Sequence, residues 1–130
     1  MYQGACIAAE VPEEFLVLSG DDLTTLPLIA SGGHGVISVI ANAFPRAFSL
    51  MTKAALEGDF EKARSFNQPL LKMYKWIFVE GSPSGIKFVL SHIGLCKPEL
   101  RLPLMELSPA SKKAMMSDLE EAIAFEKSLF

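Results

Sequence analysis

Two aspartates beside a glycine are the residues in this sequence whose types best suit contact with a polar substrate. The segment Ser19-Gly20-Asp21-Asp22 directly follows a continuous apolar run at 15–18. Glycine lets a ligand approach the backbone closely, and carboxylates accept hydrogen bonds from polar groups. The residues alone leave a second interpretation open, in which Asp21 and Asp22 only cap the helix that follows.

A second candidate segment, from Ser38 to Asn42, lies at the end of another apolar run, 36–40. If both runs are parallel strands of a barrel, their carboxyl ends lie on the same face, where such barrels place their active sites. Asp21 and Asp22 put two negative charges into the first of these loops, with no lysine or arginine near them in the sequence. We therefore do not expect a phosphorylated substrate.

Histidine and cysteine add no catalytic arrangement. Gly32-Gly33-His34-Gly35 joins a predicted helix to a strand, whereas phosphate-binding loops join a strand to a helix, so we predict an ordinary turn. His34 is then expected at the surface of the non-catalytic end, and His92, inside a helix, in a structural role. Cys6 and Cys96 lack the spacing of metal ligands and are predicted to be buried thiols of a cytoplasmic protein.

Lysine forms a Schiff base most readily where burial lowers its pKa enough to leave the amine neutral. The lysines of this sequence all fall on predicted helices or turns, and none lies within or at the end of an apolar strand. Residue types and spacing therefore predict no catalytic residue, no metal site and no cofactor.

The elements that would position the candidate segments form a strand–helix–strand unit. Met1–Glu10 is predicted to be the tail of a helix without a cap, so we expect the chain to begin inside an element. Strands are predicted at 15–18 and 36–40, with a helix at 23–31 between them. Continuous apolar runs are typical of parallel strands that are buried on both faces.

Residues beyond Asn42 are predicted to contain helices and no further strand, and to form the ordered core. The predicted features are a helix that begins near Pro45 and ends at Gly58, a helix capped by Asp59 and kinked at Pro69, a turn at Glu80-Gly81-Ser82-Pro83, a helix at 86–93 ending at Gly94, an extended segment at 98–107, and a last helix opening at Ser108-Pro109.

Composition limits the partners of this chain. It has 130 residues, 50% of them hydrophobic, a mean hydropathy of +0.30 and a formal net charge of −3. No uncharged apolar run reaches about 18 residues and no basic patch interleaves with aromatics, so neither a membrane span nor nucleic-acid binding is expected. The N-terminus shows no signal-peptide pattern, which favours a cytoplasmic protein. So much apolar content in a small chain predicts either a dense core or faces that expect a partner.

The predicted fold class is α/β, mostly helical by content: a C-terminal fragment of a (β/α)8 barrel with two parallel strands, followed by a C-terminal helical domain. Residues 1–43 would be the last βα units, and residues 44–130 the final barrel helix and the helical domain. Buried parallel strands need neighbours on both sides. We therefore expect both strands to be paired or strongly rearranged, in a homo-oligomer or against the missing barrel half.

Four segments carry a resemblance to a known family. FLVLSGDD, GGHGVISVIAN, FVEGSPSGIK and LRLPL resemble, in order and spacing, the C-terminal part of the dihydrodipicolinate synthase family, in the pyruvate-dependent class I aldolase superfamily that includes N-acetylneuraminate lyase. The resemblance implies condensation of pyruvate with aspartate semialdehyde through a Schiff base, in lysine biosynthesis. It also implies that Ile37 lies beside pyruvate, that Gly20, Asp21 and Asp22 lie near the second substrate, and that 23–31 contributes to a tetramer contact.

The resemblance places the family's Schiff-base lysine on the strand before FLVLSGDD, upstream of Met1. The family's catalytic tyrosine, threonine-containing pyruvate loop and lysine feedback site lie further upstream still. We therefore expect a fragment that is inactive alone, with pyruvate and aspartate semialdehyde as partners of the intact family. Two alternatives stay open: a non-enzymatic helical oligomerisation module, and one half of a two-chain enzyme.

Overall fold

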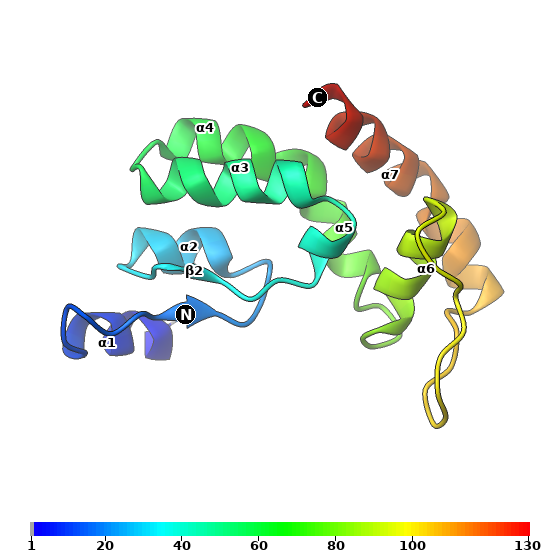
Figure 1. The fold of residues 1–130 in the computed structure, drawn as a ribbon, viewed down its shortest axis with the longest axis horizontal. Helices are drawn as coiled ribbons and strands as arrows, with labels where there is room; N and C mark the ends of the chain where they lie inside the picture. The colour runs from blue at the N-terminus through cyan, green and yellow to red at the C-terminus, as the bar shows by residue number, and fades with distance from the viewer. Residues whose placement is uncertain (1) are drawn as a thin grey trace.

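The computed structural model describes residues 2–130, which form helices and one very small parallel sheet that lies in the same half of the molecule as α1 and α2 (Figure 1). The view places α1 and α2 at one end of the molecule and α6 and α7 at the other. In chain order the elements are α1 (Tyr2–Glu10), β1 (Leu18–Ser19), α2 (Thr25–Ala30), β2 (Gly35–Val36), the 3-10 turn η1 (Ile40–Asn42), α3 (Pro45–Leu56), α4 (Phe60–Asn67), the 3-10 turn η2 (Gln68–Leu70), α5 (Leu71–Trp76), α6 (Ser84–His92) and α7 (Pro109–Ser128).

The sheet consists of β1 and β2 in parallel, with Leu18 opposite Gly35 and Ser19 opposite Val36. Backbone hydrogen bonds extend this ladder by one residue at each end: His34 N–H donates to Val17 at 2.8 Å, and Ile37 N–H donates to Ser19 at 2.9 Å. The prediction of a strand–helix–strand unit with paired parallel strands is confirmed.

The predicted strand limits, 15–18 and 36–40, are wrong at their outer ends. Phe15 and Leu16 precede the ladder and are 57% and 64% exposed, so their apolar side chains are not covered on both faces as predicted. At the other end Ile40 is buried but begins η1 instead of continuing β2. The physical reason is that β1 and β2 have only each other as strand neighbours among residues 2–130, and one short ladder supports few residues.

The α3–α4 pair follows the local signals in the sequence. Pro45 occupies the first turn of α3, where its missing N–H costs nothing. Gly58, with a φ of +80°, ends the connection in the left-handed conformation that glycine favours. Asp59 then caps α4 by accepting a hydrogen bond from the N–H of Lys62 at 3.0 Å. Pro69 lies in η2, so the predicted kink is confirmed.

The C-terminal helices also begin and end where the sequence predicts, within two residues. Ser108 caps α7 by accepting a hydrogen bond from the N–H of Ser111 at 3.2 Å. Gly94, with a φ of +81°, follows the end of α6. Between these helices the segment 98–107 belongs to the yellow-to-orange arm in Figure 1, whose end returns to the helices: the Ser84 hydroxyl donates to the carbonyl oxygen of Met105 at 2.6 Å, and Leu107 is buried.

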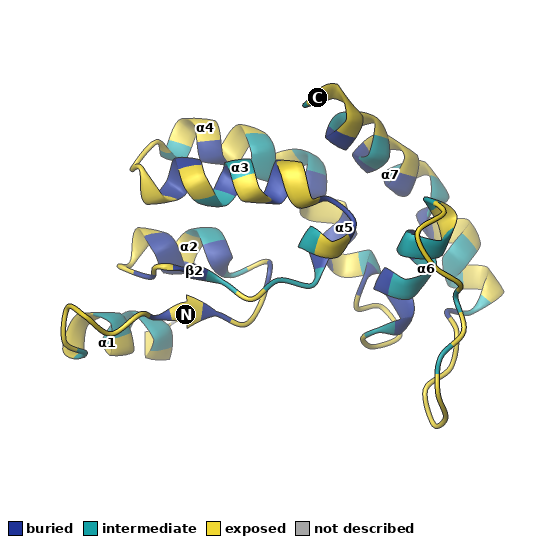
Figure 2. Cartoon of the chain, in the orientation of Figure 1, coloured by how far each residue is buried: buried dark blue, intermediate teal, exposed yellow. Residues whose placement is uncertain are grey.

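The main hydrophobic core lies in the helical part, as predicted, and joins η1, α3, α5, α6 and α7. Its largest fully buried members are Ile40, Phe44, Phe48, Met51, Leu70, Met73, Ile77, Val89, Leu107, Met115 and Leu119. Figure 2 shows the corresponding dark blue stripes on the inner faces of α3 and α7. In contrast, α1 has no buried residue, and large apolar side chains at Phe15, Leu18, Leu23 and Ile37 are exposed.

One prediction about cysteine is wrong. Cys96 is exposed and Cys6 is only half-buried, although both were expected to be buried thiols. Cys96 lies in the loop that leaves α6, where no element covers it. No helix among residues 2–130 is long and apolar enough to cross a membrane.

Candidate functional site

The predicted site residues come together at one edge of the sheet. Gly20, Asp21 and Asp22 directly follow β1, and Ile37 directly follows β2. Because the strands are parallel, both carboxyl ends lie on the same side, where ligands of α/β sheets bind. The side chain of Ile37 is 72% exposed at this edge.

Asp22 connects the two loops of the site. Its carboxylate accepts a hydrogen bond from the N–H of Ile40 at 2.9 Å and from the N–H of Val39 at 3.2 Å to Oδ1 and 3.3 Å to Oδ2. The residue is 2% exposed, so these charge-assisted bonds compensate a carboxylate that has left water. The carboxylate of Asp22 is thus bound to backbone N–H groups. That Asp22 also lies near a substrate stays a prediction.

Asp21 organises the turn that leads into α2. Its Oδ2 accepts a hydrogen bond from the N–H of Thr24 at 2.9 Å. Its carbonyl oxygen accepts from the hydroxyl groups of Ser19, at 2.7 Å, and Thr25, at 3.0 Å. α2 has Thr24 at its N-cap and no side-chain capping bond, so the capping interpretation left open by the sequence is wrong for Asp21, whose carboxylate instead closes the turn before the helix. The residue is exposed, so a carboxylate faces solvent at the site.

Gly20 has open space beside it. A Cβ added there would meet no heavy atom within 4 Å, so packing does not require glycine at this position. Gly20 is itself exposed, so the backbone between β1 and Asp21 is accessible to a ligand.

A large groove lies between β2 and α3, and Ile37 is part of its lining. It has a volume of about 710 Å³ and is lined by residues 36–38 and by one face of α3, including Phe48, Thr52 and Leu56. Most of its lining is apolar, and Leu56 is half exposed. Lys53, the lysine that lines this groove, is exposed and forms a 3.9 Å ion pair with Glu57. A solvated, paired ammonium is a poor nucleophile for carbonyl chemistry.

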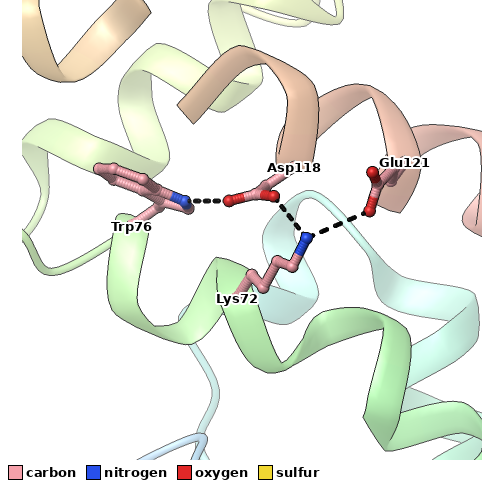
Figure 3. A network of polar contacts seen from close by, with 4 residues as sticks. All are labelled: Lys72, Trp76, Asp118 and Glu121. Atoms are coloured by element: carbon pink, nitrogen blue, oxygen red, sulfur yellow. Dashed lines mark hydrogen bonds and ion pairs between the residues drawn. The ribbon is translucent and has the colours of Figure 1, made fainter. Parts of the chain in front are cut away.

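A polar network joins α5 to α7 (Figure 3). The carboxylate of Asp118 accepts hydrogen bonds from Trp76 Nε1 at 2.7 Å and from Lys72 Nζ at 2.8 Å. Lys72 Nζ also lies 3.5 Å from Glu121. The hydrogen bond from Lys72 lowers the pKa of Asp118 below its usual value, and the same bond raises the pKa of Lys72. These contacts hold helices together and lie outside the candidate site.

Glu126 is a buried carboxylate that sequence reasoning missed. It is 8% exposed and accepts hydrogen bonds from the N–H groups of Arg46, at 2.7 Å, and Ala47, at 2.8 Å. It therefore caps the first turn of α3 from the last turn of α7. The signal was present, because Met115, Leu119, Ala122 and Glu126 follow one another at helical spacing on the buried face of α7.

The histidines lie where the sequence predicts. His34 is exposed in the turn before β2, at the edge opposite the site, and its Nδ1 accepts a hydrogen bond from the N–H of Val17 at 3.0 Å. His92 Nε2 lies 2.8 Å from Glu120, which joins α6 to α7 in a structural contact. Among residues 2–130 no group of three or more metal-ligating side chains comes together.

Comparison with known proteins places this arrangement in context. Residues 1–122 match the model of the dihydrodipicolinate synthetase family. The chain is 46% identical over 109 residues to a 4-hydroxy-tetrahydrodipicolinate synthase of Neisseria meningitidis serogroup C, covering 84% of this chain and 38% of that protein. The corresponding enzyme of Methanocaldococcus jannaschii is 49% identical over 105 residues, covering 81% of this chain and 36% of that protein.

Solved structures give the same result. A dihydrodipicolinate synthase from Aquifex aeolicus superposes with a TM-score of 0.88 at 40% identity, covering 92% of this chain and 41% of that one. A chloride-inhibited dihydrodipicolinate synthase from Acinetobacter baumannii, complexed with pyruvate, superposes with a TM-score of 0.89 at 30% identity, covering 93% and 42%. The chain thus spans about two fifths of these relatives, and the predicted fold class, part of a barrel plus a C-terminal helical part, is confirmed.

Proposed function

Because this chain belongs to the dihydrodipicolinate synthetase family, we propose that its 130 residues are the C-terminal part of a lyase whose complete barrel condenses pyruvate with aspartate semialdehyde in lysine biosynthesis. The observation that carries this proposal is the convergence of Gly20, Asp21 and Ile37 at the carboxyl edge of the β1–β2 pair. The relative from Acinetobacter baumannii, complexed with pyruvate, supports the choice of the first substrate.

In this proposal each site residue has a distinct place. Ile37 presents an exposed apolar side chain to pyruvate. Gly20 leaves room for the second substrate to approach the backbone, and Asp21 offers an exposed carboxylate beside it. Asp22 belongs to the same site, but both of its oxygens accept hydrogen bonds from the following loop.

The second part of the proposal is that these 130 residues do not react with pyruvate on their own. Schiff-base formation needs a neutral amine next to the bound ketone, and the amine becomes neutral through desolvation or a neighbouring positive charge. The lysines of the chain lie on α3 to α7 or on the loop after α6, and none lies on β1 or β2. Lys53, the one that lines the groove beside Ile37, is exposed and paired with Glu57.

The groove between β2 and α3 is the surface where the rest of a barrel fits. A parallel barrel requires each strand to have two neighbours, whereas β2 pairs only with β1 among residues 2–130. The apolar lining of the groove and the exposed Phe15, Leu16 and Leu18 offer the face on which further βα units would pack. This favours an enzyme completed by further barrel strands over an independent helical oligomerisation module.

Reconstitution tests this proposal directly. The chain is purified alone and, in parallel, co-expressed with the N-terminal barrel segment of the Aquifex aeolicus relative. We expect no turnover of pyruvate and aspartate semialdehyde by the chain alone, and turnover together with co-purification of the two polypeptides in the second sample. A homogeneous chain that turns over both substrates alone contradicts the second part of the proposal. If the two polypeptides co-purify without turnover, the first part fails.

A further inference from the structure

Two buried carboxylates hold the two ends of one connection, the segment 39–47 that leads from β2 into α3. Asp22 binds the N–H groups of Val39 and Ile40, and Glu126 binds those of Arg46 and Ala47. Among residues 2–130, Asp22 and Glu126 are the only acidic or basic residues that are buried. Both carboxylates therefore bind the same stretch of backbone, Asp22 from the loop after β1 and Glu126 from α7.

The Asp22 end of the connection is the one that adjoins the candidate site. Ile37 lies two residues before Val39, and its own N–H donates to Ser19 on β1 at 2.9 Å. The backbone around Ile37 is thus fixed on one side by the ladder and on the other by the Asp22 carboxylate. The Glu126 end lies inside the first turn of α3, beyond the buried residues Ala43 and Phe44.

We propose that Asp22 is a positioning residue: by holding the N–H groups of Val39 and Ile40 it sets the backbone of 37–40 and so the direction in which Ile37 faces the site. Glu126 fixes the start of α3 and does not set Ile37. The statement about the backbone stands on the hydrogen bonds alone. Its meaning for catalysis rests on the proposed function.

Two matched substitutions separate these roles. Asp22→Asn and Glu126→Gln each replace one acceptor oxygen with an NH2 group, which cannot accept a hydrogen bond from a backbone N–H. The two changes are chemically the same and both occur at buried sites with backbone partners. A general loss of stability would affect both variants alike, whereas a positioning role affects the site only through Asp22.

Nuclear magnetic resonance of the 130-residue chain supplies the first measurement. In Asp22→Asn we expect the methyl signals of Ile37 to shift and the amides of Val39 and Ile40 to exchange with solvent about 10-fold faster, as follows from weakening a hydrogen bond by about 1.4 kcal/mol. In Glu126→Gln we expect faster exchange at Arg46 and Ala47 with unchanged Ile37 signals. If Asp22→Asn does not fold, Asp22→Glu, which keeps both oxygens but moves them by one methylene, takes its place.

Unchanged Ile37 signals in the Asp22 variant, or equal shifts in both variants, would overturn the proposal.

The reconstituted enzyme supplies the second measurement. There, Asp22→Asn should lower kcat/KM for pyruvate by about 10-fold to 100-fold, since small misplacements of site residues have effects of this size. Glu126→Gln should change it less than about 2-fold. An Asp22→Asn enzyme with the unsubstituted kcat/KM overturns the catalytic meaning. If the reconstituted enzyme without substitutions is inactive, the proposed function is refuted instead. The resonance data then still decide whether Asp22 sets the direction in which Ile37 faces.

Discussion

The carboxylate of Glu126 lies 2.8 Å from the backbone nitrogen of Ala47, so the last turn of α7 caps the first turn of α3 across 79 residues of sequence. The neighbouring N–H of Arg46 donates to the same carboxylate at 2.7 Å, and Arg46 Nε donates to the carbonyl oxygen of Leu129 at 3.1 Å. The C-terminal helical part is thereby fastened to the helix that follows β2. Its contribution to stability can be measured directly.

Glu126→Ala should lower the free energy of unfolding by about 2 kcal/mol, because it removes a helix cap and leaves two N–H groups without their acceptor. The measurement is urea denaturation followed by circular dichroism. Glu121→Ala is the control. Glu121 lies on the same helix but is exposed, and it forms a solvent-exposed ion pair with Lys72 at 3.5 Å instead of a buried cap. The control should change stability by less than about 0.5 kcal/mol. Equal losses in the two variants would contradict the capping role.

The Asp118 contact should make stability depend on pH in the acid range. The pKa of Asp118 is held below its usual value by the hydrogen bond from Lys72 and then by that from Trp76. The carboxylate therefore binds protons more readily in the unfolded chain. Its contribution is fully present above the usual pKa of 3.8 and is lost as pH falls through the lower folded-state value.

Trp76 is the only tryptophan in the sequence, so its fluorescence reports on this contact. We expect the stability difference between the unsubstituted chain and Asp118→Asn to shrink as pH falls from about 6 to about 3. The emission of Trp76 should change over the same range. A difference that grows towards low pH would have the wrong sign for this account.

Close packing at Gly85 should make a single added methyl group destabilising. A Cβ at Gly85 would lie 2.5 Å from the carbonyl oxygen and 2.6 Å from the Cα of Ile77, so α6 would have to move away from the end of α5. Gly85→Ala should cost about 1–3 kcal/mol, the usual cost of overpacking. Gly20→Ala, whose Cβ meets nothing within 4 Å, should cost less than about 0.5 kcal/mol. Thermal unfolding of the two variants compares them directly, and equal melting temperatures would contradict the packing at Gly85.

Tyr74 should resist ionisation while the chain is folded. Burial raises the pKa of its phenol, with smaller contributions from the negative charges of Asp22 and Asp21, and its hydroxyl donates to Asn67 Oδ1 at 2.7 Å. A raised pKa means that the folded state keeps the proton, so this group's stabilisation is present below its usual value of 10.0 and is lost as pH rises above it. Ultraviolet titration of the unsubstituted chain and of Tyr74→Phe compares their phenolate absorbance. The phenolate that appears at the highest pH should be missing in Tyr74→Phe. A Tyr74 signal at an ordinary phenol pKa would contradict its burial.

The local signals of the sequence were sufficient for the helices and for the order of the elements. Asp59, Ser108 and Pro45 act at helix starts and Gly58 after a helix end, because each depends only on the chain within a few residues. The pairing of two parallel strands was also predictable from their continuous apolar runs.

The strand limits could not be predicted, because they depend on neighbours. The apolar residues Phe15 and Leu16 resemble a strand that is buried on both faces, yet both are exposed among residues 2–130. Strand formation needs hydrogen-bond partners as well as apolar side chains. One short ladder pairs only two residues of each strand, with one further backbone hydrogen bond at each end.

The roles of the acidic residues depend on contacts that are distant in sequence. Asp22 and Val39 are 17 residues apart, and Glu126 and Ala47 are 79 apart, so no local pattern pairs them. The sequence suggested a substrate-facing or a capping role for Asp22, and only the fold shows which backbone groups its carboxylate binds. That Asp21, Gly20 and Ile37 share an edge with it followed from the rule for parallel strands.

The most direct test of the whole account is borohydride trapping of the purified 130-residue chain with pyruvate, followed by mass spectrometry. The reduced Schiff base is a stable covalent adduct, so the result does not depend on turnover. The account predicts that no lysine of the chain carries the adduct, while the intact Aquifex aeolicus relative treated in parallel does. A stoichiometric adduct on Lys53, or on any other lysine of the chain, would contradict the claim that these residues keep the family's shape without its reactive amine.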